Sequence, residues 1–350
     1  MFRRNKSNSL IGVDISSSAV KMVELGGSME EPSVKAYAVQ SMPRGAYADG
    51  HIVKLDEISE TLENCLRRCG SSANLAAVAM PTSTVIIKRF IIPSGLAGDE
   101  LEVRIEAEAN QHIPFPLGDV NLDYQIISEE EEVSQVLIVA AKTERVDDQV
   151  AVVESCGLKV RVVDVESYTL LCAMQLFASD LKAGPDSVVA LVDIGANMIT
   201  VSIFKDEEAL FSRQQPVGGN QLTQEIARHY GMEFAQAETA KLGGTLEDNY
   251  EPEILAPFMD NMALEISRAL QFFFTSTPYT RVDQILLAGG CATLPGMADV
   301  VSTRTQIYTK IANPFERMEV DRGVNSNSLK LDAPSLITAC GLAMRCFDPK

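Results

Sequence analysis

The sequence has little of what several common classes of functional site require. It contains no tryptophan, only three histidines, and seven cysteines that form no C-x-x-C pair. Scattered histidines give no support to a His-based metal site or a Ser/His triad. The cysteines predict free thiols in a reducing compartment. No apolar run is long enough to cross a bilayer, and the N-terminus lacks the apolar core of a signal peptide. We therefore expect a cytoplasmic protein.

Positive charge is also scarce. Thirty Lys and Arg residues stand against 48 Asp and Glu residues, so the formal net charge is −18. Because no broad basic face is available, we expect no nucleic-acid partner. The one small basic cluster, Arg3, Arg4 and Lys6, is typical of a solvated tail rather than of a membrane anchor. A chain of 350 residues predicts two or more domains.

Strand and helix signals alternate along most of the chain, which predicts an α/β protein. The pattern changes over 85–162. There an apolar strand, a charged helix and two strands split by "SEEEEVS" predict a small inserted α+β subdomain. Its apolar run from Ile86 to Ile92 is open to two interpretations, an edge strand that binds a partner or a central strand of the sheet. The Gly-Pro stretch "SDLKAGPDS" over 179–187 predicts a domain boundary.

One pattern occurs twice. "LIGVDISSSAVKMVEL" (10–25) and "VALVDIGANMITVSIF" (189–204) each hold a short apolar strand that ends in Asp-Ile, then small or polar residues, then a second alternating strand. The repeat predicts a duplicated domain with a site between the halves. Asp14 and Asp193 would then hold a hydrated Mg²⁺, while backbone amides of the turns bind an anion. The alternative for each aspartate is a structural turn residue that accepts backbone hydrogen bonds.

A third element, "ILLAGGCATLPGM" (285–297), is a strand that ends in Gly289-Gly290, where a flat ligand can lie against backbone. In this order the three elements resemble the actin, sugar-kinase and Hsp70 superfamily of ATP-binding proteins. The resemblance implies a duplicated actin-like ATPase fold with Mg-ATP in a cleft between two domains. It implies a first domain from 1–84 and 163–185, a second from 186–330 with a helical part over about 222–281, and a closing helix over 331–350.

The same resemblance implies the site residues. Asp14 and Asp193 would bind the metal, and Glu166 with Asp193 would act on water, although Glu166 equally suits a first-turn acid that stabilises a helix dipole. "ETAK" (238–241) matches the pattern that grips ribose and adenine. Lys21 could reach a phosphate or could be an exposed strand lysine, and Asn220 is expected to be an N-cap. The implied nucleotide contacts are Asp14, Ser16, Ser17, Ser18, Gly195, Asn197, Gly218, Gly219, Glu238, Lys241, Gly289 and Gly290.

Within the superfamily, "EAEANQHIPFPLGDVNLDYQII" and "VGGNQLTQEIARHYG" resemble the PilM family of type IV pilus assembly, which is related to FtsA. This implies a scaffold with ATP as a structural ligand. Its partners would be the cytoplasmic N-terminal segment of the inner-membrane protein PilN, in a groove between the inserted subdomain and the first domain, and other pilus inner-membrane and motor components. The end "GLAMRCFDPK" has no amphipathic anchor, so attachment to the inner membrane would run through the partner.

The alternative is an ATP-hydrolysing or phosphotransfer enzyme of the same superfamily. Many relatives carry glycine where this chain has Ser16, and the chaperones have Gly-Gly where it has Ala196-Asn197. Since those glycines let backbone approach the γ-phosphate, their replacement predicts a slow ATPase at most.

Overall fold

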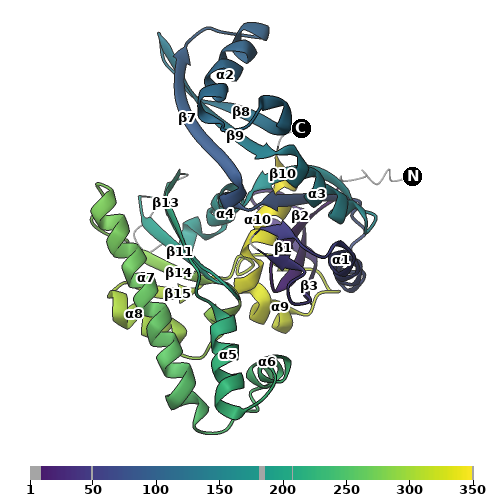
Figure 1. Cartoon of the computed structure of the whole chain (residues 1–350), viewed down its shortest axis with the longest axis vertical. Coiled ribbons are helices and arrows are strands. Elements are labelled where there is room, and N and C mark those ends of the chain that lie inside the picture. The colour runs from purple at the N-terminus through teal and green to yellow at the C-terminus, as the bar shows by residue number, and fades with distance from the viewer. Residues whose placement is uncertain (1–8, 49, 181–185, 207, 349–350) are drawn as a thin grey trace.

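A computed structural model describes residues 9–48, 50–180, 186–206 and 208–348 (Figure 1). The basic cluster Arg3, Arg4 and Lys6 and the middle of the predicted boundary at 179–187 lie outside the described residues. Among the described helices, none is both long and apolar enough to cross a membrane.

The first domain is built on a six-stranded sheet in the order β10-β6-β1-β2-β3-β16. The strands β1, β2 and β3 form an antiparallel meander, and β6 and β10 lie parallel to β1. Odd-numbered residues of β1, such as Ile11 and Val13, pack under α1 and α3, whereas Gly12 on the other face touches α10. The elements are β1 (Leu10–Ile15), β2 (Ala19–Gly27), β3 (Pro32–Ser41), β6 (Leu75–Met80), β10 (Lys159–Val165), β16 (Glu319–Val320), α1 (Leu55–Cys69), α3 (Thr143–Glu154) and α10 (Ile337–Met344).

The second domain repeats this plan. Its sheet has the order β13-β12-β11-β14-β15, again a meander followed by two parallel strands. Helices α5, α7 and α8 cover one face and α4 covers the other. The shared strand order confirms the predicted duplicated actin-like fold. The elements are β11 (Val188–Ile194), β12 (Ile199–Lys205), β13 (Glu208–Gln215), β14 (Gln284–Ala288), β15 (Thr309–Ile311), α4 (Glu166–Met174), α5 (Gly219–Tyr230), α6 (Phe234–Gly243), α7 (Ala256–Ser276) and α8 (Met297–Thr305).

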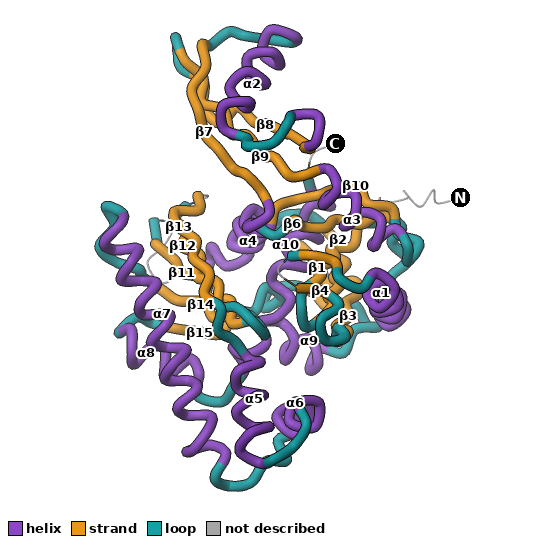
Figure 2. Tube along the Cα trace, viewed as in Figure 1, coloured by secondary structure: helices purple, strands orange, loops and turns teal. Residues whose placement is uncertain are grey.

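Two helices, α4 and α10, cross where the domains meet (Figure 2). A Cβ atom on Gly341 of α10 would lie 2.1 Å from the Thr169 carbonyl oxygen of α4, and one on Gly12 would lie 2.1 Å from the Ala339 carbonyl oxygen. Glycine is therefore required at both positions, because any side chain would push the helix away from its neighbour. The chain returns to the first domain through α9 (Ser326–Asp332) and α10.

The inserted unit is shorter than the sequence predicted. It holds the three-stranded sheet β7-β9-β8 with α2 on one face. However, α3 packs into the core of the first domain, and β10 pairs with β6 from Lys159↔Leu75 to Val165↔Met80. The predicted end at residue 162 is therefore wrong, and the insertion ends near Lys142. The apolar pattern of a sequence can predict a strand, but it does not show which sheet that strand joins. The bounds are β7 (Val85–Pro93), α2 (Asp99–His112), β8 (Val120–Glu129) and β9 (Val133–Lys142).

Candidate functional site

The Asp14 carboxylate has a partner within its own hairpin. Register places Lys21 of β2 directly opposite Asp14 of β1, and the Lys21 Nζ lies 2.9 Å from the Asp14 Oδ2. Both side chains are half-buried, so the pair offsets part of the cost of removing the carboxylate from water. The sequence pattern alone leaves the role of Lys21 open. The available signal is the seven-residue spacing across a short turn, which puts both residues on one face of the hairpin.

Three carboxylates act on this lysine. Burial alone would lower the pKa of Lys21, yet Asp14, Asp193 and Glu166 together raise it. Burial raises the pKa of Asp193 even though Lys21 opposes that shift. One lysine therefore faces Asp14, Asp193 and Glu166, and this excess of negative charge favours a further cation. Oxygen ligands of this kind are the type that Mg²⁺ prefers.

The metal would need ligands beyond the protein. Within the described ranges, no three His, Cys, Asp or Glu side chains are grouped as a metal site. Magnesium commonly takes one or two carboxylates and completes its shell with water and phosphate oxygens. Asp14 and Asp193 fit that requirement, and a Mg²⁺ ion held by them would need water or phosphate oxygens to complete its shell.

Glu166 is the first residue of α4, and it lies in the same neighbourhood. Burial, with Asp14 and Asp193 nearby, raises the pKa of Glu166 to about 7, although the Thr82 backbone N–H donates to it. The Thr82 hydroxyl oxygen also accepts a hydrogen bond from the Ser167 backbone N–H, at 3.1 Å. A carboxyl group with a pKa near neutrality can accept a proton under physiological conditions.

The turns of the two hairpins touch each other across the domains. The Asn197 side-chain amide donates to the Ser17 hydroxyl at 3.0 Å, and the Asn220 side-chain amide donates to the Asn197 side-chain Oδ1 at 2.6 Å. The Ser16 hydroxyl is engaged within its own turn with the backbone of Ala19. Ser18 is exposed, and its carbonyl oxygen accepts from the Met42 N–H at 2.9 Å.

The predicted N-cap role of Asn220 is wrong. Helix α5 begins at Gly219 and its N-cap is Gly218. A Cβ atom on Gly218 would lie 2.6 Å from the Gly195 carbonyl oxygen, so only glycine lets the helix start this close to the turn. The backbone N–H of Asn220 donates to the Ala196 carbonyl oxygen at 2.8 Å, and its side chain points to Asn197 instead of capping α5.

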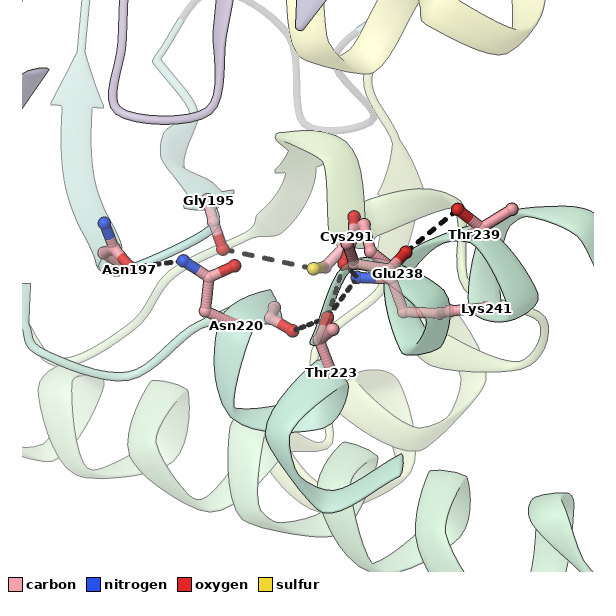
Figure 3. A network of polar contacts seen from close by, with 10 residues as sticks. Gly195, Asn197, Asn220, Thr223, Glu238, Thr239, Lys241 and Cys291 are labelled. Atoms are coloured by element: carbon pink, nitrogen blue, oxygen red, sulfur yellow. Dashed lines mark hydrogen bonds and ion pairs between the residues drawn. The ribbon is translucent and has the colours of Figure 1, made fainter. Parts of the chain in front are cut away.

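The "ETAK" residues form a polar network with α5 (Figure 3). The Lys241 Nζ lies 2.7 Å from the Glu238 Oε2 and 2.8 Å from the Thr223 hydroxyl, which donates to Glu238 at 2.5 Å. Cys291 stands beside this network, with its Sγ 4.0 Å from the Gly195 carbonyl oxygen. Sequence reasoning missed Thr223, whose one signal was its position one helical turn after Gly219.

Gly289 is required by its conformation and by its neighbours. Its φ is +86°, and a Cβ atom there would lie 2.4 Å from the Asp193 Oδ1. Gly290 faces open space. We expect Gly289→Ala to displace Asp193 and lower the affinity for Mg-ATP at least about tenfold, whereas the control Gly323→Ala, where a Cβ atom meets open space outside the site, changes it little. Calorimetric titration of Mg-ATP into both variants measures this, and equal affinities would contradict the proposed fit around Asp193.

Comparisons with known proteins agree over nearly the whole chain. A family model described as "Type IV pilus assembly protein PilM" matches residues 12–347. The solved structure of a PilM-PilN type IV pilus biogenesis complex is similar with a TM-score of 0.78 and 26% identity, covering 97% of this chain and 99% of that chain. The ethanolamine utilization protein EutJ from Carboxydothermus hydrogenoformans has a TM-score of 0.57 and 18% identity, covering 95% of this chain and 88% of its own.

A curated relative is the cell division protein FtsA of Bacillus subtilis (strain 168). It is 20% identical over 361 residues, which cover 89% of this chain and 80% of the relative. The matched region of the family model includes both repeated hairpins from Gly12 onward, and the crossing helices α4 and α10.

Proposed function

Because this chain belongs to the family of the type IV pilus assembly protein PilM, we propose that it is an ATP-binding, actin-like scaffold of pilus assembly. Its partner is the cytoplasmic N-terminal segment of the inner-membrane protein PilN. The similarity to a structure of a PilM-PilN complex supports this partner. In this account the protein is cytoplasmic and peripheral to the inner membrane, held there by PilN, and it contacts other inner-membrane and motor components of the pilus.

The observation that carries the nucleotide part is the grouping of Asp14, Asp193 and Glu166 around Lys21 at the facing hairpins. When bound, Mg-ATP would supply the cation that offsets this excess of negative charge, and the phosphate oxygens that complete the coordination of that cation. Asp14 and Asp193 hold the metal, and Lys21 neutralises phosphate charge.

The remaining contacts divide between phosphate and nucleoside. Ser17, Ser18, Asn197 and Gly218 offer backbone amides and short side chains to phosphate. The Ser16, Gly195 and Gly219 N–H groups instead donate to backbone carbonyl oxygens and hold the turns in shape. Glu238 and Lys241 grip the ribose and adenine, and Gly289-Gly290 lets the base lie against backbone. Since these residues come from both domains, bound nucleotide favours the conformation in which the hairpins touch.

The inserted unit supplies a surface for the partner. Within the described residues β7 pairs with β9 alone, so β7 is an edge strand with backbone groups free to pair. Its Ile91 side chain is 61% exposed. An extended peptide can add to such an edge through backbone hydrogen bonds and be selected by apolar contacts.

The insertion also contacts the second domain, because Arg89 of β7 forms an ion pair with Glu208 of β13 at 2.6 Å. The strand β7 begins directly after the turn Thr82–Thr84, and the Thr82 backbone N–H donates a hydrogen bond to Glu166. A structural change at the nucleotide site can therefore move β7 through the Thr82–Glu166 hydrogen bond or through the Arg89–Glu208 ion pair.

The partner surface is tested by titrating a synthetic PilN N-terminal peptide into the full chain with Mg-ATP. We expect binding, and we expect Ile91→Asp to weaken it about tenfold because a charge replaces an apolar contact. Val103→Asp is the matched control, since Val103 is 66% exposed on α2 of the same unit. Equal affinities in both variants would remove β7 from the partner surface, and no binding to wild type would refute the pilus scaffold.

One observation favours the second candidate, an ATP-hydrolysing enzyme. Glu166 has a pKa of about 7 and could take a proton from attacking water. Phosphate release from Mg-ATP discriminates the two candidates, since a structural ligand is retained unhydrolysed over the lifetime of the complex.

A further inference from the structure

A contact between an arginine and an aromatic ring joins the two domains away from the phosphate hairpins. Arg44 lies in the loop between β3 and β4 (Tyr47–Ala48) of the first domain. Its guanidinium Cζ is 4.3 Å from the ring centroid of Phe234, the first residue of α6 in the second domain. This distance is within the range of a cation–π interaction.

Phe234 shares a helix face with the proposed nucleoside-binding residues. Glu238 and Lys241 follow it by four and seven residues along α6, so the three side chains lie on one side of the helix. In the described part of the chain, Phe234 is not among the side chains that build or cover the second domain's core. The ring is half-buried and extends toward Arg44.

The loop that carries Arg44 is anchored at the other end of the same site. The Met42 N–H donates to the Ser18 carbonyl oxygen in the phosphate turn, at 2.9 Å. Tyr47, just after Arg44, is buried in the core of the first domain with 7% of its surface exposed. Both flanks of the loop are therefore fixed, and Arg44 reaches α6 from a rigid base.

We propose that Arg44 and Phe234 form a clasp that spans the nucleotide site from the first domain to the second and slows the release of bound nucleotide. This inference rests on the proposed function, because the clasp acts only on a nucleotide bound at that site. Separation of the domains must break the Arg44–Phe234 contact as well as the Asn197–Ser17 hydrogen bond. An exposed cation–π contact slows release about two- to fivefold.

The test is the dissociation rate of a fluorescent purine nucleotide, 2-aminopurine riboside triphosphate with Mg²⁺, chased from the full chain by excess ATP. We expect Arg44→Ala and Phe234→Ala each to release it about two- to fivefold faster, and the double variant to be no faster than the faster single variant. Phe234→Tyr keeps the ring and should keep slow release. Arg67→Ala, which removes an exposed arginine from the last turn of α1, is the control for lost charge.

Three outcomes overturn the clasp. The first is unchanged release from Arg44→Ala. The second is fast release from Arg44→Ala but wild-type release from Phe234→Ala, since Arg44 would then act on phosphate and not through the ring. The third is faster release from the control as well. If the wild-type chain fails to bind the analogue and ATP, the proposed nucleotide site falls together with the clasp, whereas normal binding with unchanged rates overturns the clasp alone.

Discussion

Glu166→Gln is expected to raise the free energy of unfolding by about 3 kcal/mol at pH 8, and by only about 1 kcal/mol at pH 5.5, without nucleotide or metal. Burial raises the pKa of the Glu166 carboxyl from 4.5 to about 7, so the folded chain binds this proton more tightly than the unfolded chain. Stability from this group is greatest at low pH and is lost as pH rises through about 7. Glutamine cannot ionise, so the variant keeps the stability that wild type loses.

Chemical denaturation at the two pH values measures this effect. Glu144→Gln is the matched control, because Glu144 is an exposed first-turn acid of α3. We expect the control to change stability by less than about 0.5 kcal/mol at either pH. If Glu166→Gln instead lowers stability by a similar small amount at both pH values, the helix-dipole interpretation of Glu166 holds and its place in the charged group is wrong.

Asp193→Ala is expected to weaken Mg-ATP binding at least about 100-fold, because it removes a carboxylate that we propose as a metal ligand and leaves Lys21 with fewer partners. Asp193→Asn keeps the size of the side chain and should lose nearly as much, since the negative charge is what the metal needs. Fluorescence titration with the 2-aminopurine nucleotide measures both.

Asp283→Ala provides the control for this prediction. Asp283 precedes β14 and accepts from the Val188 N–H at 2.9 Å, at the opposite end of the same strand pair from Asp193. The control should bind nucleotide normally even if its stability falls. Unchanged affinity in Asp193→Ala would contradict the site.

The fold could be predicted to a large extent because its two halves repeat. In each half a short apolar strand ends in Asp-Ile before a turn, so the sequence alone places Asp14 and Asp193 at equivalent positions of the two halves. The resemblance to the PilM family and to FtsA is likewise confirmed. In contrast, the sequence pattern assigns most of β10 to the insertion, because strand pairing between residues far apart in sequence is set by tertiary packing.

The site is harder to predict wherever two side chains meet through packing or strand pairing that no local pattern shows. Asn220 has the residue type and position of an N-cap, yet close packing of Gly218 on the turn gives its side chain another partner. The alternating pattern around Lys21 fits a solvent-exposed side chain equally well, and only the strand register places Lys21 opposite Asp14. No local pattern connects Arg44 with Phe234, which are 190 positions apart. The Arg44–Phe234 pair depends on how the domains close and not on local sequence.

The central claim is that nucleotide between the two hairpins controls binding of the partner. The most direct measurement is calorimetric titration of the PilN peptide into wild type and into Asp193→Ala, each with and without Mg-ATP. The account predicts that Mg-ATP tightens peptide binding to wild type and has no effect on Asp193→Ala. A peptide affinity that responds to Mg-ATP equally in both proteins, or in neither, would contradict it.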